Sequence, residues 1–247
     1  MVSGRIESKS ARQTAHIQRG TALKRCYFGD YRFSEDLDFT LARAADFAEI
    51  RNGLEEVYQH VAQASGIRFV FDREDRQSHV NSYTFYLGYQ GPLPIPNTVK
   101  VDITIAESVL FPVEQKEILR AYNEFNDIPE GRAVAVYSLN EIATEKVVAF
   151  GDRARNEPRD LYDLWFLTAH AGVELHLLLP AIEEKLRFRN KKIAGLQDRI
   201  VAKEARLKSL WNNRLGHQME TLPEFDTTFC AVRRELRQAE KSVIEII

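Results

Sequence analysis

Three aspartates have the spacing expected of a metal-binding carboxylate cluster. Asp36 and Asp38 are two residues apart within Ser34–Leu41, where apolar and polar residues alternate. Residues two apart in a strand project from the same face, so the two carboxylates would lie side by side. Carboxylates this close repel each other unless a cation or protons intervene. A divalent metal ion bound by both removes that repulsion.

Asp102 is the third candidate because it belongs to a second alternating stretch, Val99–Ile105. The apolar residues of this stretch would fill one face of a strand while Asp102 projects from the other. If the two strands are neighbours, the three carboxylates can hold two Mg²⁺ ions about 4 Å apart, as in-line displacement at phosphorus requires. Asp102 is then also able to accept the proton of an attacking hydroxyl. The alternative is that these acids are ordinary solvated strand positions.

Gly20 and Thr21 precede the first two aspartates and predict a phosphate-binding turn. Thr21 is suited to begin a short helix over Thr21–Phe28. A Gly-Thr turn at a helix start offers backbone N–H groups and a hydroxyl to phosphate oxygens. Together with Asp36 and Asp38, this turn is a more specific signal than either part alone.

The elements around these residues predict a mixed sheet flanked by helices, an α+β fold. Val99–Ile105 follows a Gly- and Pro-rich loop over 91–97, and helical patterning dominates from about Glu174, with an interruption near 216–223. We therefore predict a catalytic domain over residues 1–172 and a helical, partly basic region over 173–247. Further strands are expected at Ile67–Phe71, Ser82–Tyr89 and Val134–Tyr137, and helices at Ala44–Ala64, Leu139–Asp152 and from Pro158.

Composition excludes several classes of protein. Hydrophobic residues make up 44% and charged residues 28% of the 247 residues, as in ordinary globular domains. The chain has no apolar run of about 18 residues and no apolar leader, so we expect a cytoplasmic protein with no membrane partner. Cys26 and Cys230 have neither metal-ligand nor redox spacing, which argues against a zinc site or a disulfide scaffold.

The charge of the chain is unevenly distributed. The net charge is -2, yet residues 185–214 contain ten Lys and Arg against Asp198 and Glu204, a local balance of +8. A basic helical tract of this kind is typical of a surface that follows a nucleic-acid backbone. A solvated helix face would explain the same pattern.

Four motifs in order resemble those of the AbiEii/AbiGii toxin family of nucleotidyltransferases. Gly20-Thr21-Ala22-Leu23 with Arg32-Phe33-Ser34-Glu35-Asp36-Leu37-Asp38-Phe39 resembles the first motif, and Val101-Asp102-Ile103 resembles the second. Glu145–Phe150 with Arg153 is similar to the third, and Arg159–Leu164 to the fourth.

The resemblance implies a polymerase β-like nucleotidyltransferase fold, Mg²⁺ (or Mn²⁺) as cofactor and a nucleoside triphosphate as substrate. It also implies a toxin of a toxin-antitoxin or abortive-infection system of phage defence, with a cognate antitoxin. The acceptor it favours is RNA, at the 3′ end of tRNA. In this reading Asp36, Asp38 and Asp102 are the metal-binding and catalytic residues.

The later motifs are compatible with binding of a triphosphate. On a helix, Lys146 and Arg153 are seven apart and share a face, so both can reach triphosphate oxygens or the leaving pyrophosphate. The alternative for Lys146 is an ordinary solvated lysine. Asp163 and Arg159 have the spacing of a surface ion pair. The family resemblance instead implies that Asp163 is a site residue that orients Lys146 or the nucleotide.

Two departures from the family pattern keep other functions open. Arg19 replaces the first of two glycines before Thr21, which would hinder a positive φ or a close approach of phosphate, although an arginine can itself bind phosphate. Residues 1–18 are polar and predict no strand, so a sheet edge would be left open. The alternatives are nucleotidyl transfer to a small molecule or a protein hydroxyl, and a catalytically inactive nucleotide-binding protein.

Overall fold

The computed structural model describes residues 15–74, 81–91, 95–105, 107–120, 131, 133–152 and 154–244. The chain divides into two compact units, and each contains two separate stretches of sequence. The first unit consists of residues up to Ile17 and Asp36–Glu107, and the second of Gln18–Glu35 and Ser108–Ile247. The division into a catalytic domain and a helical region near residue 172 stays a prediction. In the described parts of the chain, no helix is both long and apolar enough to cross a membrane.

The first unit is built on a mixed sheet, as predicted. Its strands lie in the order β3-β4-β5-β2-β1, and β2 and β5 are parallel while the other neighbours are antiparallel. The strands are β1 (Ala15–Ile17), β2 (Leu37–Leu41), β3 (Arg68–Glu74), β4 (Ser82–Gln90) and β5 (Pro96–Thr104). Four of them match strands expected from alternating apolar residues.

The expectation that no strand precedes Gly20 is wrong. Ala15–Ile17 pairs antiparallel with β2, from Ala15 opposite Leu41 to Ile17 opposite Phe39. Three residues with only one large apolar side chain are too short for a periodic pattern, so pairing with β2 rather than local sequence makes this strand. The edge of β2 is therefore covered by β1 over these residues.

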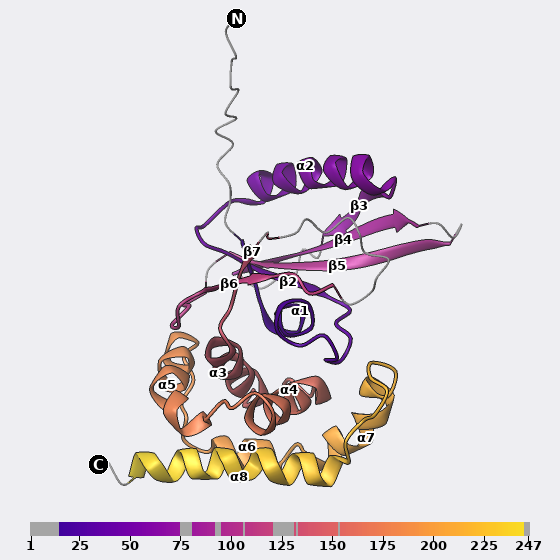
Figure 1. Ribbon diagram of the computed structural model, residues 1–247. Helices are drawn as coiled ribbons and strands as arrows, with labels where there is room; N and C mark the ends of the chain where they lie inside the picture. The colour runs from indigo at the N-terminus through magenta and orange to yellow at the C-terminus, as the bar shows by residue number, and fades with distance from the viewer. Residues whose placement is uncertain are drawn as a thin grey trace, which may run out of the picture. The chain divides into compact units, whose positions relative to one another are not determined.

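One face of this sheet carries the apolar core of the unit. Helix α2 (Phe47–Ser65) lies along that face (Figure 1). Asp46 caps its start, because the Asp46 side chain accepts a hydrogen bond from the Glu49 N–H. Gly66 ends the helix with a left-handed φ of 73°. Its buried Ile50 packs with side chains of β4 and β5. Leu37, Phe39, Leu41, Val99, Val101 and Ile103 all contribute to this core or pack against it.

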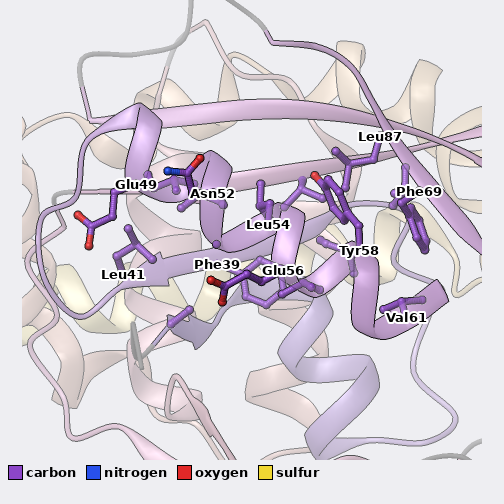
Figure 2. A pocket seen from close by; sticks show the side chains of 18 of the residues that line it. Phe39, Leu41, Glu49, Asn52, Leu54, Glu56, Tyr58, Val61, Phe69 and Leu87 are labelled. Carbon is purple, nitrogen blue, oxygen red and sulfur yellow. The ribbon is translucent and has the colours of Figure 1, made fainter. Parts of the chain in front are cut away.

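A cavity of about 940 Å³ lies between α2 and this sheet face (Figure 2). Its lining is mostly apolar and includes Phe39, Leu54 and Phe69. Because Leu37, Phe39 and Leu41 line it, Asp38 lies on the other face of β2. The cavity and the carboxylates are therefore on opposite sides of the sheet.

The second unit is largely helical. Its strands β6 and β7 pair antiparallel. The elements are α1 (Arg19–Ala22), the π-type turn η1 (Leu23–Tyr27), β6 (Glu114–Glu117), β7 (Ala133–Val136), α3 (Leu139–Phe150), α4 (Pro158–Ala169), η2 (Leu175–Leu178), α5 (Leu179–Phe188), α6 (Leu196–Val201), α7 (Glu204–Leu215) and α8 (Phe225–Ile244). The sequence of β6 is too polar to predict a strand. The interruption of the helical pattern predicted near 216–223 separates α7 from α8.

Helices α3 and α4 form the centre of this unit. α3 begins at Ser138, whose hydroxyl accepts a hydrogen bond from the Glu141 N–H, and α4 begins with Pro158, which needs no N–H partner there. They pack on each other, and α4 also packs on α7 and α8 (Figure 1). Both helices contain buried charged residues, which apolar periodicity alone would not predict.

Candidate active site

Two of the three predicted aspartates face each other on adjacent parallel strands. Asp38 of β2 is in register with Asp102 of β5, and Asp36 lies one residue before β2. Both strands turn their apolar residues to the α2 side, so Asp38 and Asp102 project from the opposite face. All three aspartates are half-buried. The adjacency of the two strands, on which the predicted cluster depends, is confirmed.

Lys100 and Thr84 hold the Asp102 carboxylate. The Lys100 Nζ donates to Asp102 Oδ2 at 2.6 Å, and the Thr84 hydroxyl of β4 donates to Asp102 Oδ1 at 2.6 Å. Burial alone would lower the pKa of Lys100, but the hydrogen bond and charge of Asp102, with the charges of Asp36 and Asp38, raise it. All three carboxylates therefore act electrostatically on one ammonium group.

These carboxylates have the donor chemistry of a magnesium site, because Mg²⁺ prefers carboxylate oxygens. Among the residues that the structure describes, however, no three His, Cys, Asp or Glu side chains are arranged to hold a metal ion. Asp102 instead contacts Lys100 and Thr84. The residue types nevertheless fit the ion.

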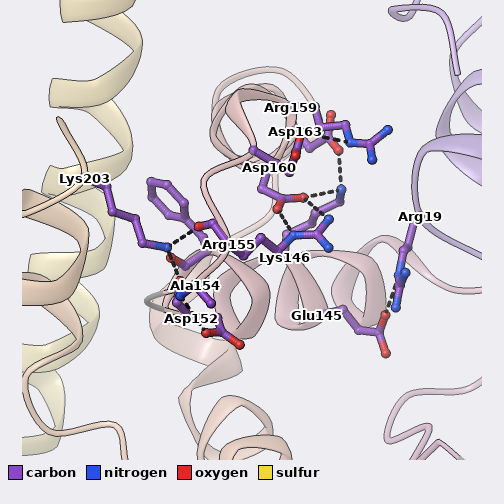
Figure 3. Close-up of polar contacts among 12 residues, drawn as sticks. Arg19, Glu145, Lys146, Asp152, Ala154, Arg155, Arg159, Asp160, Asp163 and Lys203 are labelled. Carbon is purple, nitrogen blue, oxygen red and sulfur yellow. Dashed lines mark hydrogen bonds and ion pairs between the residues drawn. The ribbon is translucent and has the colours of Figure 1, made fainter. Parts of the chain in front are cut away.

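In the second unit, Lys146 and Asp163 are in direct contact. Lys146 of α3 is only 4% exposed, and its Nζ lies 2.6 Å from Asp163 Oδ2 and 2.8 Å from Asp160 Oδ1, both on α4 (Figure 3). Asp160 also accepts from Arg155 Nε at 2.5 Å. The alternative of a solvated Lys146 is wrong. A buried ammonium between two carboxylates is neutralised locally, which is how charges are tolerated in a protein interior.

Arg32 and Tyr31 complete the surroundings of Asp163. The Arg32 guanidinium donates to both Asp163 oxygens, from Nε at 2.7 Å and from Nη2 at 2.9 Å, and the Tyr31 hydroxyl donates to Oδ1. Arg32 also donates to Gln218 Oε1 at 3.2 Å. A bidentate pair of this geometry fixes both partners. The segment that leads to Asp36 is thereby fastened to α4.

These contacts determine the protonation of the carboxylates. Burial alone would raise the pKa of Asp163, but the charges of Arg32 and Lys146 outweigh it and hold the pKa at about 2. For Asp160, burial is likewise outweighed by Lys146 and Arg155, and its pKa lies well below the usual range. Both side chains are carboxylates at neutral pH and do not act as general acids there.

Arg19 adopts the positive φ that a glycine at this position would favour. Arg19 has a φ of 55°, which favours glycine. Its Nε donates to the buried Glu145 Oε2 at 3.4 Å. The next residue, Gly20, is tightly enclosed, because a Cβ there would lie 3.1 Å from both Arg32 Nη2 and Ser34 Oγ. Thr21 is buried.

Two expectations about the later motifs have different outcomes. Asp163 is fully buried, so it does not form the surface pair with Arg159 that its spacing allows. The Arg159 Nε instead lies 3.8 Å from Glu157 Oε2. The predicted role of Arg153 stays a prediction, because this residue lies outside the described residues.

The basic tract is not a uniform solvated face. Lys185 is fully buried between Glu141 (2.6 Å) and Glu145 (2.9 Å). The Lys203 Nζ donates to the carbonyl oxygens of Phe150, the last residue of α3, and of Asp152 and Arg155 in the segment that follows it (Figure 3). Several of the remaining cations are also engaged: Arg199 with backbone carbonyls, Lys191 with Asp152, and Lys208 with Asp226. The exposed members include Arg187, Lys192, Arg206 and Arg214.

Sequence reasoning missed several residues of these two clusters as site residues, among them Asp160, Arg32, Thr84 and Lys100. Asp160 lies in the fourth motif and Arg32 in the first, but nothing in their spacing indicated a buried ion network. Thr84 and Lys100 carry a signal only in retrospect, because each is a polar position in an alternating strand next to Asp102.

A mixed sheet whose adjacent parallel strands present paired aspartates on the face away from α2 is an arrangement that a nucleotidyltransferase can use. The comparisons identify the family. Residues 20–232 match the model of the nucleotidyl transferase AbiEii toxin family of type IV toxin-antitoxin systems. The chain belongs to this family and is a nucleotidyltransferase toxin, which implies a nucleoside triphosphate substrate and an antitoxin partner.

A solved structure supports the fold. The chain is similar to MenT4, a nucleotidyltransferase toxin from Mycobacterium tuberculosis H37Rv, with 17% sequence identity and a TM-score of 0.57. The similarity covers 92% of this chain and 76% of MenT4. The α+β nucleotidyltransferase fold expected from the sequence is confirmed. A search of functionally characterised sequences gives no significant match.

Proposed function

We propose that this chain transfers a nucleoside monophosphate from a nucleoside triphosphate to the 3′ end of tRNA, with Mg²⁺ or Mn²⁺ as cofactor. The main support is the register of Asp38 opposite Asp102, with Asp36 just before the same strand. These residues bring hard oxygen ligands from adjacent parallel strands to one face of the sheet, and such ligands suit Mg²⁺ and Mn²⁺.

Asp36, Asp38 and Asp102 hold the metal in this proposal. When bound, the metal neutralises phosphate charge and lowers the pKa of the attacking hydroxyl. Asp102 accepts the proton of that hydroxyl, and the Thr84 hydrogen bond orients its carboxylate. Lys100 offsets part of the negative charge of the three acids.

A second group of residues binds the triphosphate. Gly20 and Thr21 offer backbone N–H groups to phosphate oxygens, and Lys146 and Arg153 contribute positive charge. Asp163 acts as a positioning residue, because its contact with Lys146 at 2.6 Å fixes the ammonium group. A side chain at Gly20 would have to displace the ends of Arg32 and Ser34, each 3.1 Å from the position of a Cβ.

The acceptor is proposed to be RNA because of the family resemblance and the exposed cations Arg187, Lys192, Arg206 and Arg214. Contacts between such cations and phosphates weaken steeply as salt increases. Two cavities formed by described residues lie away from the carboxylates. One lies on the α2 side of the sheet, the other is formed by residues such as Asn156, Asp198 and Arg199, and neither is lined by Asp36, Asp38 or Asp102.

The direct test is label transfer. The full chain is incubated with each α-³²P-labelled nucleoside triphosphate, Mg²⁺ and total tRNA, and the products are separated on denaturing gels. We expect label in tRNA, at the 3′ terminal nucleotide after nuclease digestion, and none with Asp38→Asn or with EDTA. Transfer to a protein or a small molecule alone would reject the RNA acceptor. Calorimetric nucleotide binding without any transfer would reject catalysis.

A further inference from the structure

The open face of the sheet in the first unit carries an arginine stacked on a tyrosine next to the carboxylates. The Arg73 guanidinium of β3 lies over the Tyr86 ring of β4, with Cζ 4.1 Å from the ring centroid. Phe85 and Leu87 on either side of Tyr86 belong to the buried core, so Tyr86 projects from the opposite face. That is the face from which Asp38 and Asp102 project.

Strand register places this pair close to the carboxylates. Tyr86 is opposite Lys100, and Thr84 is opposite Asp102. Tyr86 is thus one strand and two residues from Asp102, which corresponds to about 5 Å across the sheet and about 7 Å along it. Arg73, Tyr86 and Lys100 form a row across β3, β4 and β5.

A β-bulge in β3 aims Arg73 at this face. Phe71 is opposite Leu87, so regular pairing would put Asp72 opposite Tyr86 and Arg73 opposite the core residue Phe85. The register shifts between Phe71 and Arg73, and Arg73 lies opposite Tyr86 instead. One extra residue therefore turns a long cation from the core side to the carboxylate side, a use of bulges found beside active sites.

The guanidinium plane remains accessible. The Arg73 side chain is 63% exposed, and its ion pair is with the neighbouring exposed Asp72 at 3.2 Å. Exposed ion pairs of this kind contribute little, so Asp72 does not hold the guanidinium away from a ligand. Single-stranded nucleic acids are bound by stacking bases on aromatic rings and on arginine planes beside a cationic track.

We propose that Arg73 and Tyr86 form a nucleobase-binding platform beside the carboxylates. A base stacks on the outer face of the guanidinium, Tyr86 supports the inner face, and the charges of Arg73 and Lys100 attract the adjoining phosphate. This inference rests on the proposed function and deepens it. The base comes either from the 3′ end of the acceptor RNA or from the nucleoside triphosphate.

The test measures binding and does not require turnover. One probe is a fluorescein-labelled 12-nucleotide single-stranded RNA ending in CCA, followed by anisotropy, and the others are the four nucleoside triphosphates with Mg²⁺, followed by calorimetry. For Tyr86→Leu we expect Kd to rise about tenfold for one of these two ligand types, the scale of a lost base-stacking contact. A change for the RNA alone assigns the base to the acceptor, and a change for a triphosphate alone assigns it to the donor nucleotide.

Substitutions at both residues separate stacking from charge. Tyr86→Phe keeps the ring and is expected to bind within twofold of the wild type. Arg73→Lys keeps the charge but loses the plane, so affinity falls while the salt dependence of binding is retained. The matched control is Arg51→Lys. The Arg51 Cζ lies 5.0 Å from the centroid of the Phe71 ring, and Phe71 projects from the opposite face of β3. This control is expected to leave every Kd unchanged.

A double-mutant cycle tests the contact between base and platform directly. It uses a probe in which the nucleotide that would stack on the platform has no base. If the base contacts the platform, removing the base and introducing Tyr86→Leu are non-additive. Unchanged Kd values in Tyr86→Leu for both ligand types, with its unfolding transition intact, overturn the platform even if the wild type transfers nucleotides. Weaker binding by Tyr86→Leu supports the platform even if no transfer to RNA is found, so the two proposals fail separately.

Discussion

Asp38 and Asp102 lie opposite each other on adjacent parallel strands, on the sheet face that points away from α2. The relationship depends on two alternating patterns that each bury their odd-numbered apolar residues, since both strands must then expose their even-numbered acids on the same side. A shift of one residue in either strand would move its acid to the core. The face on which the two acids lie is therefore fixed by the apolar residues that alternate with them, and the register of the two strands places them opposite each other.

Removing the charge of Asp102 should abolish transfer without unfolding the chain. Asp102→Asn removes a metal ligand and the proposed proton acceptor at a half-buried position, so we expect the initial rate of label transfer to fall about 10³-fold or more. Thr84→Val keeps the carboxylate but loses its hydrogen bond, and a smaller loss is expected. Asp226→Asn, at an exposed ion pair in the second unit, is the control and should retain full rate. A rate for Asp102→Asn within tenfold of the wild type would contradict the assignment.

Substitutions of one lysine and one arginine of the basic tract should differ greatly in their effect on stability. Lys185→Met leaves the buried Glu141 and Glu145 without their common partner and should lower the free energy of unfolding by about 3–5 kcal/mol. Arg187→Met, two residues further along α5, changes an exposed side chain and should alter it by less than about 0.5 kcal/mol. Urea unfolding followed by circular dichroism compares the two. Equal effects would mean that Lys185 is not a buried structural cation.

The contrast between buried Lys185 and exposed Arg187 shows which features of the fold and of the site the sequence could predict. Alternating residues identified β2, β4 and β5 because each has one buried and one open face, and that pattern is visible in a single strand. The ion network around Lys146, Asp160 and Arg32 is invisible at this level, since a charged residue is buried only when residues far along the chain supply its partners. The local charge of +8 includes two buried cations for the same reason, because distant groups bind Lys185 and Lys203.

The Asp163 carboxylate should make the protein sensitive to acid in a defined range. Its pKa is about 2 in the folded chain against an ordinary value of 3.8, so the folded state binds fewer protons than the unfolded state between these values. The stabilisation is fully present above about pH 4 and is lost as the pH falls through 2, in total roughly 2 kcal/mol.

Urea midpoints of the wild type and Asp163→Asn, measured from pH 6 to pH 2, provide the check. The difference in free energy of unfolding between the two proteins should shrink as the pH falls below 4. Asp160 contributes in the same direction in both proteins, but it shares Lys146 with Asp163, so its contribution cancels only in part. A constant difference across this range would show that the Asp163 pKa is not depressed.

Arg19 offers a test of whether its position is built for glycine. Its φ of 55° costs an L-residue roughly 1–2 kcal/mol, and its contact with Glu145 offsets part of that cost. Arg19→Ala loses the contact and keeps the strain, whereas Arg19→Gly loses the contact and relieves the strain. Thermal and urea unfolding should therefore find Arg19→Gly more stable than Arg19→Ala by about 1 kcal/mol, even though glycine gains more freedom in the unfolded chain. If alanine is equal or better, the positive φ is not a constraint in solution. If nucleotide binding tightens only in Arg19→Gly, the close backbone approach that a second glycine permits is also the feature that binds phosphate.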